Sequence, residues 1–186
     1  MLSQFTKEGL HATLANLFNF PKDVYPVGRL DTDSEGLLIL TNDKRLNSLL
    51  LDPKHAHKRT YLIQVEGVVT KEAKEKLEQG VSIEVNGKKY TTRPSKAELL
   101  NDLQRFPERN PPIRFRKNIP TSWIRLTLTE GKNRQVRKMT AKVGFPTLRL
   151  IREKIEDITL ESLELNVVKE IYREELFKLL NIHQVL

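Results

Sequence analysis

The sequence predicts an α+β fold, because strand and helix signals follow one another without the regular βαβ alternation of a doubly wound sheet. Residues 60–67 and 122–129 each alternate apolar and polar side chains, which is typical of half-buried strands. The Asn86-Gly87 pair inside residues 81–92 is a favoured turn of a β-hairpin. With 186 residues, the chain is long enough for one domain, or for one domain with two lobes.

The N-terminal part of the chain carries three further signals. Apolar residues at helical spacing predict a helix over residues 7–19, namely Leu10, Leu14, Leu17 and Phe18. Residues 37–41 form a short apolar run that predicts a buried strand. Asn42 or Asp43 can cap a second helix, which ends before Pro53.

The middle of the chain contains signals for one more helix, a hairpin and a short strand. Thr70 can cap a helix that Gly80 ends, and the hairpin of residues 81–92 follows. Residues 98–100 predict another short strand. Residues 105–117 combine three prolines with five basic residues, so we expect a long basic loop or a hairpin projection over residues 104–121.

The C-terminal part begins with the strand of residues 122–129. A helix over residues 133–142 follows and ends at Gly144. Residues 147–151 predict one more strand, and residues 174–180 a last helix.

Charge and composition narrow the classes of function. The chain has 32 Lys and Arg against 24 Asp and Glu, a net charge of +8, which favours a polyanion such as nucleic acid as the partner. The alternative is a generally basic surface without such a partner. Because the chain has no cysteine, thiolate catalysis, cysteine zinc sites and disulfides are excluded. There is no long apolar run and no charged start before one, so we expect neither a membrane span nor secretion.

The first motif is the stretch Gly28-Arg29-Leu30-Asp31, which leads through a polar turn into the apolar run. A carboxylate on a turn between strands is well placed to face a cleft, which makes Asp31 the first candidate for chemistry. One alternative is that Asp31 only caps the turn. A calcium loop is a weaker alternative, because its twelfth position is Asn42 and the apolar run crosses it.

The second motif is Lys58-Arg59-Thr60-Tyr61, a basic approach to a strand that carries a tyrosine. A tyrosine offers a flat face on which a base can stack and a hydroxyl for a hydrogen bond. Tyr61 shares a strand face with Ile63, so it is also a candidate core residue. The two interpretations are compatible if the end of the strand lies at a cleft.

The third motif runs from Glu130 to Met139 and includes a helix. On that helix Val136 and Met139 belong to an apolar stripe, and the opposite face is basic, with Arg134, Lys138 and Lys142. Arg137 lies at the flank, about 100° from Val136 at 3.6 residues per turn, so it is best placed to turn inward. The alternative is a solvated basic helix without a site.

A metal site is not expected from the histidines. His55 and His57 lie two residues apart, but no cysteine and no clear third ligand accompany them.

Together, the three motifs resemble the RNA pseudouridine synthases, in the branch of the small-subunit synthases and closest to the E type that modifies the RNA of the large subunit. The resemblance covers residues 25–151 and includes the stretches 109–114, 119–123 and 144–152. It implies one catalytic domain over residues 1–186, with a bent, mixed and largely antiparallel sheet, flanking helices and two lobes around a central cleft. Relatives start with a strand bearing a Lys-Pro pair, often after a small RNA-binding domain, and we expect this chain to lack both.

The resemblance also implies an activity, the isomerisation of one uridine in 23S ribosomal RNA to pseudouridine with base flipping. Asp31 would be the nucleophile, Arg137 its ion-pair partner, Tyr61 the stacking residue and Arg29 the residue that fills the space of the flipped base. No metal or organic cofactor is implied. The expected partner is the 23S RNA, and a cytoplasmic monomer is expected.

The remaining candidates are side chains for RNA contacts. We expect these at Arg59, Lys132, Arg134, Lys138, Lys142, Arg114, Arg116 and Lys117, with Val136 packed beside the base. The alternative function is a non-catalytic RNA-binding or ribosome-assembly module on the same fold, which would share the basic surface but would have no need of Asp31, Tyr61 and Arg137 together.

Overall fold

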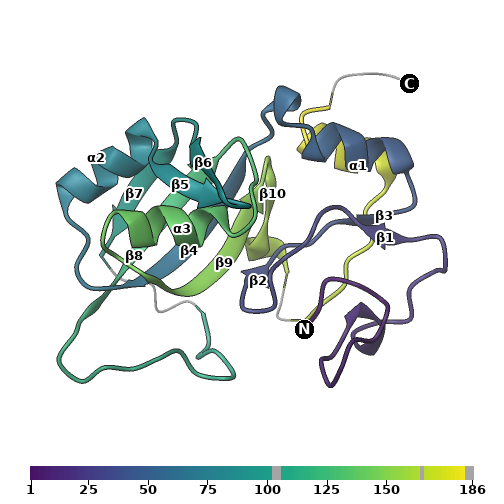
Figure 1. The fold of residues 1–186 in the computed structure, drawn as a ribbon. Helices are drawn as coiled ribbons and strands as arrows, with labels where there is room; N and C mark the ends of the chain where they lie inside the picture. The colour runs from purple at the N-terminus through teal and green to yellow at the C-terminus, as the bar shows by residue number, and fades with distance from the viewer. Residues whose placement is uncertain (102–105, 164–165, 183–186) are drawn as a thin grey trace.

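A mixed sheet forms the centre of the computed structural model, which describes residues 1–101, 106–163 and 166–182 (Figure 1). The strands lie in the order β10-β9-β4-β8-β7, and all of these neighbours are antiparallel. A short strand, β2, joins β9 in parallel. The bounds are β2 Glu35–Gly36, β4 Arg59–Glu66, β7 Lys96–Leu100, β8 Thr121–Leu128, β9 Thr147–Ile155 and β10 Ile158–Thr159. The predicted α+β fold with a largely antiparallel mixed sheet is confirmed.

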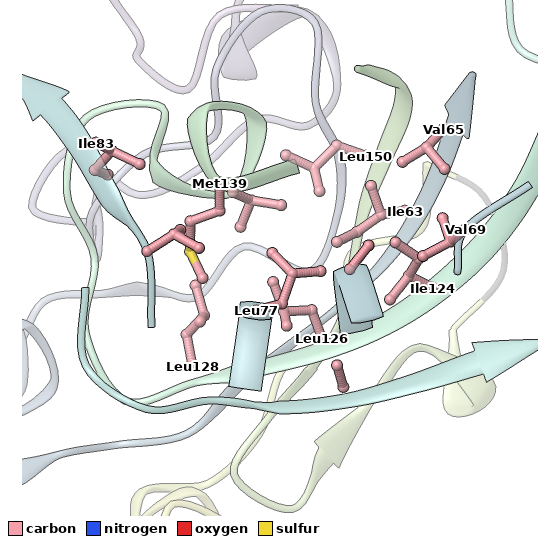
Figure 2. Packing of buried hydrophobic residues seen from close by; sticks show 14 residues of the cluster. Ile63, Val65, Val69, Leu77, Ile83, Ile124, Leu126, Leu128, Met139 and Leu150 are labelled. Atoms are coloured by element: carbon pink, nitrogen blue, oxygen red, sulfur yellow. The ribbon is translucent and has the colours of Figure 1, made fainter. Parts of the chain in front are cut away.

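One face of the sheet is covered by α2 (Lys71–Gln79), α3 (Gln135–Lys142) and a hairpin of β5 (Ser82–Val85) and β6 (Lys88–Thr91). As predicted, Thr70 caps α2 and a tight turn with positive φ at Asn86 and Gly87 joins the hairpin. The apolar faces of these elements meet in one core cluster, shown in Figure 2. Ile63, Leu126 and Met139 are fully buried there.

A second apolar cluster lies beyond β10, around α1 (Lys44–Leu51) and α4 (Arg173–Leu179). It includes residues next to β1 (Tyr25–Pro26) and β3 (Leu40–Thr41), which pair with each other. Asp43 caps α1 by accepting a hydrogen bond from Arg45 N, as the sequence predicts. Figure 1 shows the sheet with α2 and α3 on one side and α1 with β1 and β3 on the other. The two clusters match the expected two lobes.

Two predicted elements are wrong in extent. Residues 7–19 do not form a helix, and the structure has only a short 3-10 turn, Leu14–Asn16. Gly9 has a φ of +58°, and Leu10 is fully exposed. The Asn16 side chain accepts a hydrogen bond from Thr13 N at 2.8 Å, so the short turn begins at Thr13, well after the predicted start of the helix.

The apolar run of residues 37–41 is not one strand. Instead the chain pairs with β9 at Glu35–Gly36 and with β1 at Leu40–Thr41. A Cβ on Gly36 would lie 2.3 Å from Arg152 O, so the main chain approaches β9 more closely there than another residue would allow.

The other predicted elements are confirmed within a few residues, except that β9 runs on to Ile155. Two further 3-10 turns, Pro53–His55 and Leu160–Ser162, complete the assignment. The basic segment is a loop over residues 106–120, whereas its predicted residues 104 and 105 lie outside the described part. We call residues 106–120 the arm, and Figure 1 shows it projecting from the sheet. Among the described residues, no helix is long and apolar enough to cross a membrane.

Candidate active site

Asp31 lies on a turn between β1 and β2, at the junction of the two lobes. Ser34 N donates to Asp31 O at 2.9 Å, which closes the turn, and Ser3 Oγ binds the main chain of Leu30 just before it. The side chain of Asp31 is 34% exposed. We call residues 31–37 the aspartate turn.

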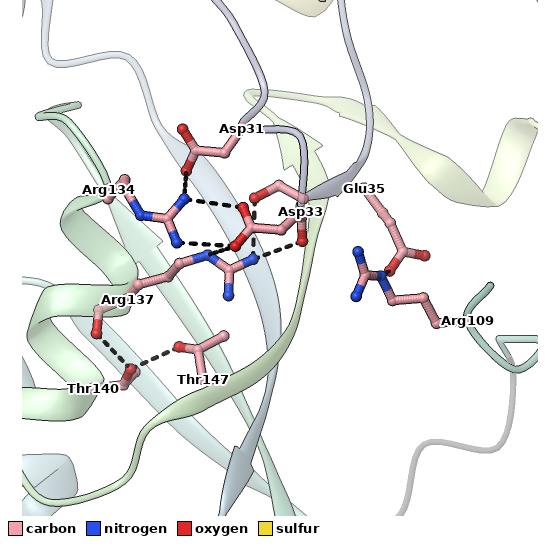
Figure 3. A network of polar contacts seen from close by, with 9 residues as sticks. Asp31, Asp33, Glu35, Arg109, Arg134, Arg137, Thr140 and Thr147 are labelled. Carbon is pink, nitrogen blue, oxygen red and sulfur yellow. Dashed lines mark hydrogen bonds and ion pairs between the residues drawn. The ribbon is translucent and has the colours of Figure 1, made fainter. Parts of the chain in front are cut away.

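Arg134 connects the aspartate turn to the start of α3. Its guanidinium donates to both carboxylate oxygens of Asp33, at 3.1 and 2.9 Å, and lies 3.6 Å from Asp31 Oδ2 (Figure 3). The hydrogen bond from Arg134 lowers the pKa of Asp33, and the same bond raises the pKa of Arg134. Arg134 does not lie on a helix face as predicted. It precedes α3 with φ 51° and ψ 32°, a left-handed conformation that directs the side chain away from the helix surface.

Arg137 is the inward-turned residue of α3, as its flank position predicts. Its Nη2 donates to Asp33 O at 2.7 Å, and its Nε lies 3.4 Å from Asp33 Oδ2. Burial lowers the pKa of its guanidinium. The short contacts of Arg137 go to Asp33, whose carboxylate lies between the guanidinium groups of Arg134 and Arg137 (Figure 3). The charge of Asp31 acts on Arg137 from farther away and opposes the effect of burial on its pKa.

Strand β9 holds the other end of the aspartate turn through two buried arginines. Arg149 binds both oxygens of Glu35, at 3.0 and 2.8 Å, and Arg152 Nε donates to Leu37 O at 2.7 Å. Leu37 N in turn donates to Arg152 O. Sequence reasoning missed all of these contacts. Arg149 and Arg152 were visible only as charges beside the apolar residues Leu148, Leu150 and Ile151, which is a signal for a paired or functional residue.

Tyr61 reaches this region from the neighbouring strand. It is half-buried, packs against the first core cluster and lies opposite Arg152 in the β4–β9 pair. Burial lowers the pKa of Arg152, and the nearby Arg59 lowers it further, whereas Tyr61 raises it. Arg59 also donates to Leu50 O in α1. The second motif is therefore joined to the aspartate turn through Arg152.

Glu130 is a buried residue that holds the start of α3 through hydrogen bonds. This carboxylate is 2% exposed and accepts hydrogen bonds from Tyr90 OH, Arg93 N and Gln135 Nε2. The bond to Glu130 raises the pKa of Tyr90. Because Gln135 is the first residue of α3, Glu130 fixes the start of the helix that carries Arg137. In the sequence, Glu130 directly follows the alternating strand of residues 122–129. This position at the end of a half-buried strand was the available signal that its carboxylate is buried.

The remaining predicted residues lie around this centre. Val136 is 5% exposed and belongs to the first core cluster. Lys132 lies over the Tyr90 ring, with its Nζ 5.1 Å from the ring centroid. The other basic candidates are either exposed (Arg29, Lys142, Arg114 and Lys117), half-buried on α3 (Lys138) or paired with Glu66 at 2.9 Å (Arg116).

The described residues contain no group of three or more His, Cys, Asp or Glu side chains that could hold a metal ion. His57 Nδ1 lies 3.1 Å from Glu156 Oε1, and His55 is exposed. The site thus consists of carboxylates and guanidinium groups. Such a set can keep a carboxylate ionised for nucleophilic attack and can bind the phosphates of a polyanion.

Comparisons with known proteins agree with this arrangement. A family model described as RNA pseudouridylate synthase matches residues 2–142. Ribosomal large subunit pseudouridine synthase E of Vibrio parahaemolyticus is 50% identical over 170 residues, which cover 91% of this chain and 69% of that protein. A protein of the same name from Xanthomonas axonopodis pv. citri is 46% identical over 165 residues, or 88% of this chain and 84% of that protein.

A solved structure titled as a pseudouridylate synthase is also similar, with a TM-score of 0.72 and 30% identity. The match covers 90% of this chain and 65% of that one. The predicted fold and enzyme class are therefore confirmed together. This chain belongs to the RNA pseudouridylate synthase family and is an isomerase of that kind.

Proposed function

We propose that this chain converts a uridine of 23S ribosomal RNA to pseudouridine, with Asp31 as the nucleophile. The names of its most similar relatives support a substrate in the large ribosomal subunit. One observation supports the residue assignment most: Asp31 lies 3.6 Å from the guanidinium of Arg134, yet the short hydrogen bonds of Arg134 and Arg137 go to Asp33.

This division between the two carboxylates suits the chemistry. A nucleophilic carboxylate must be ionised, and nearby positive charge favours the ionised form. It must also be free to approach the substrate, and a bidentate bond to an arginine would hold its oxygens in place. Asp33 takes the bidentate bond, so Asp31 is left with one longer contact of 3.6 Å and its oxygens can approach the substrate.

The reaction breaks the N1–C1′ glycosidic bond of the uridine and forms a C5–C1′ bond. C5 loses its hydrogen as a proton and N1 takes up a proton, so the product is an isomer of the substrate. The uracil has to detach, rotate and reattach, which requires a flipped nucleotide held in a closed pocket. In the proposal Tyr61 stacks on the base and Val136 packs beside it. Arg29 is exposed next to Asp31 and takes the place that the base leaves in the RNA.

Binding of the RNA would depend on the basic residues around the site. Arg134 contacts the aspartate turn, Lys138 and Lys142 belong to α3, Lys132 precedes α3 and Arg59 begins β4. The other three, Arg114, Arg116 and Lys117, belong to the arm. Each phosphate that such a residue neutralises steepens the salt dependence of binding. We propose that residues 1–186 act as one catalytic domain, as a monomer in the cytoplasm where the ribosomal RNA is.

Release of tritium from ribosomal RNA labelled at C5 of uridine tests the function directly, because the reaction expels that hydrogen. We expect release by the wild type and none by Asp31→Asn, with equal RNA affinity in a filter-binding assay. If neither protein releases tritium while both bind RNA tightly, the non-catalytic RNA-binding module is the better description. Release by Asp31→Asn at the wild-type rate would refute the nucleophile assignment.

A further inference from the structure

We infer that the tip of the arm, meaning the residues around Phe115, is a second RNA subsite. There Phe115 stacks on an unpaired base other than the modified uridine. The inference rests on the proposed RNA substrate and adds the chemical class of the group bound there. Phe115 is the residue that carries it, and Arg114 and Lys117 hold the adjoining phosphates.

The exposure of Phe115 is the first observation. Its side chain is 84% exposed, and it belongs to neither core cluster. An aromatic ring left in water gains nothing for the fold, since the free energy of burying it is forgone. Ile113, two residues earlier, is half-buried, and Ile119 near the end of the arm is 36% exposed, so Phe115 is by far the most exposed large apolar side chain of the arm.

The anchoring of the arm is the second observation. Near its start Arg149 Nη1 donates to Pro107 O at 2.9 Å, and Arg109 Nε lies 3.3 Å from Glu35. Near its end Arg116 pairs with Glu66, and Gly67 N donates to Pro120 O at 2.7 Å. Both ends of the arm are thus held by the rest of the protein. The arm therefore loses less conformational entropy when RNA binds to its tip.

Charge identifies the occupant. Arg109 and Arg116 are used in the anchors, whereas Arg114 and Lys117 are exposed and make no ion pair with any described residue. An aromatic ring between exposed cations is the arrangement that binds single-stranded nucleic acid, because bases stack on the ring and phosphates meet the charges. Another protein surface would not need this concentration of positive charge.

The position of the arm links the subsite to the active site. Glu35, which Arg109 and Arg149 share, lies four residues after Asp31 on the aspartate turn. A strand of RNA with its uridine at Asp31 therefore lies next to the start of the arm. Because the subsite is outside the reacting atoms, it contributes to affinity and leaves the chemical step unchanged.

Binding of labelled oligoadenylate of about 12 nucleotides tests the subsite, since adenylate cannot be a substrate. We expect Phe115→Ala to weaken binding of the single strand roughly 5- to 100-fold, the effect of losing one base stack. Binding of the same strand paired with its complement should stay as in the wild type. Phe115→Trp should restore binding, and Phe115→Leu should not.

The matched control is Tyr172→Ala, which removes another exposed aromatic ring, 82% exposed, away from the arm. It should leave oligoadenylate binding unchanged. Equal losses for single strand and duplex, or full binding by Phe115→Leu, would overturn the inference. So would a dimer in sedimentation that Phe115→Ala abolishes, because a second copy would then cover the ring.

Tritium release separates this inference from the proposed function. Phe115→Ala should raise KM for the ribosomal RNA and keep kcat. If the wild type releases no tritium but Phe115→Ala still weakens oligoadenylate binding, the subsite stands and the catalytic proposal fails. If release is normal and Phe115→Ala binds as the wild type does, only the subsite fails.

Discussion

The aspartate turn and the arm are both irregular segments beside the sheet, yet they are held in different ways. The turn is fixed along its whole length by arginines from two elements, Arg134 and Arg137 near α3 and Arg149 and Arg152 on β9. The arm is fixed near its ends, and its tip is exposed. Chemistry requires a carboxylate held to within a fraction of an ångström, whereas stacking on an RNA base requires an aromatic ring that is left exposed.

Among the residues that hold the turn, the largest expected effect comes from removing Arg137, the buried side chain that donates to it. Arg137→Ala takes away the bond to Asp33 O and the positive charge near Asp31, so kcat should fall roughly 100- to 1000-fold. Steady-state tritium release measures kcat and KM separately. Arg137→Lys should recover part of kcat, because it restores the charge. A change in KM alone would show that Arg137 belongs with the binding residues.

The next effect tests whether α3 is held from beneath. Glu130→Gln replaces the charged, buried acceptor of three hydrogen bonds by a neutral amide and removes the ion pair with Arg93, so stability should fall by about 1–3 kcal/mol. Urea unfolding measures the change, with Glu75→Gln on the exposed surface of α2 as the control. Stability equal to that of the wild type would mean that Glu130 does not organise the third motif.

A smaller effect is expected on the arm. Arg114→Ala and Lys117→Ala should each weaken RNA binding a few-fold and flatten the plot of log K against log salt by about one unit. Filter binding over a range of salt concentrations measures the slope, and kcat should not change. If either variant reduces kcat as much as Arg137→Ala does, the distinction between a positioned turn and a binding arm is lost.

The smallest effect concerns acid stability. The pKa of Asp33 is lowered in the folded state, mainly by its bond to Arg134, so its contribution is present above the ordinary value of 3.8. That contribution is lost as pH falls through the lower folded pKa. Because the side chain is 39% exposed, it amounts to less than about 1 kcal/mol. The stability difference between wild type and Asp33→Asn should therefore shrink in urea unfolding below pH 4, and a difference that grows there would contradict the assignment.

Local patterns predicted most of the fold. The strands β4 and β8 and the helices α1 and α2 each have a signal within a few neighbouring residues, namely an alternation of apolar and polar side chains or a capping residue. Their bounds therefore agree closely with the prediction. The prediction of a helix over residues 7–19 was wrong, because leucines at helical spacing stabilise a helix only where another part of the protein buries them. Leu10 is fully exposed and packs against nothing. Gly9, which adopts a positive φ, was the local signal against this helix.

The site was predicted in part for a similar reason. Asp31, Tyr61 and Arg137 stand in recognisable motifs, and the structure joins those motifs. The pairing of Glu35 with Arg149, 114 residues apart, depends on the parallel contact of β2 with β9, which no local pattern encodes. That Asp33 would take the arginine bonds instead of Asp31 depends on the left-handed conformation of Arg134, which is equally a tertiary feature.

Single-turnover tritium release by Asp31→Asn and Asp33→Asn, side by side, tests the division between the two carboxylates most directly. We predict that Asp31→Asn releases nothing at any time and keeps the wild-type melting temperature. Asp33→Asn should release tritium more slowly but to completion, because its carboxylate positions the arginines and does not react. Complete release by Asp31→Asn together with none by Asp33→Asn would show that the two roles are reversed.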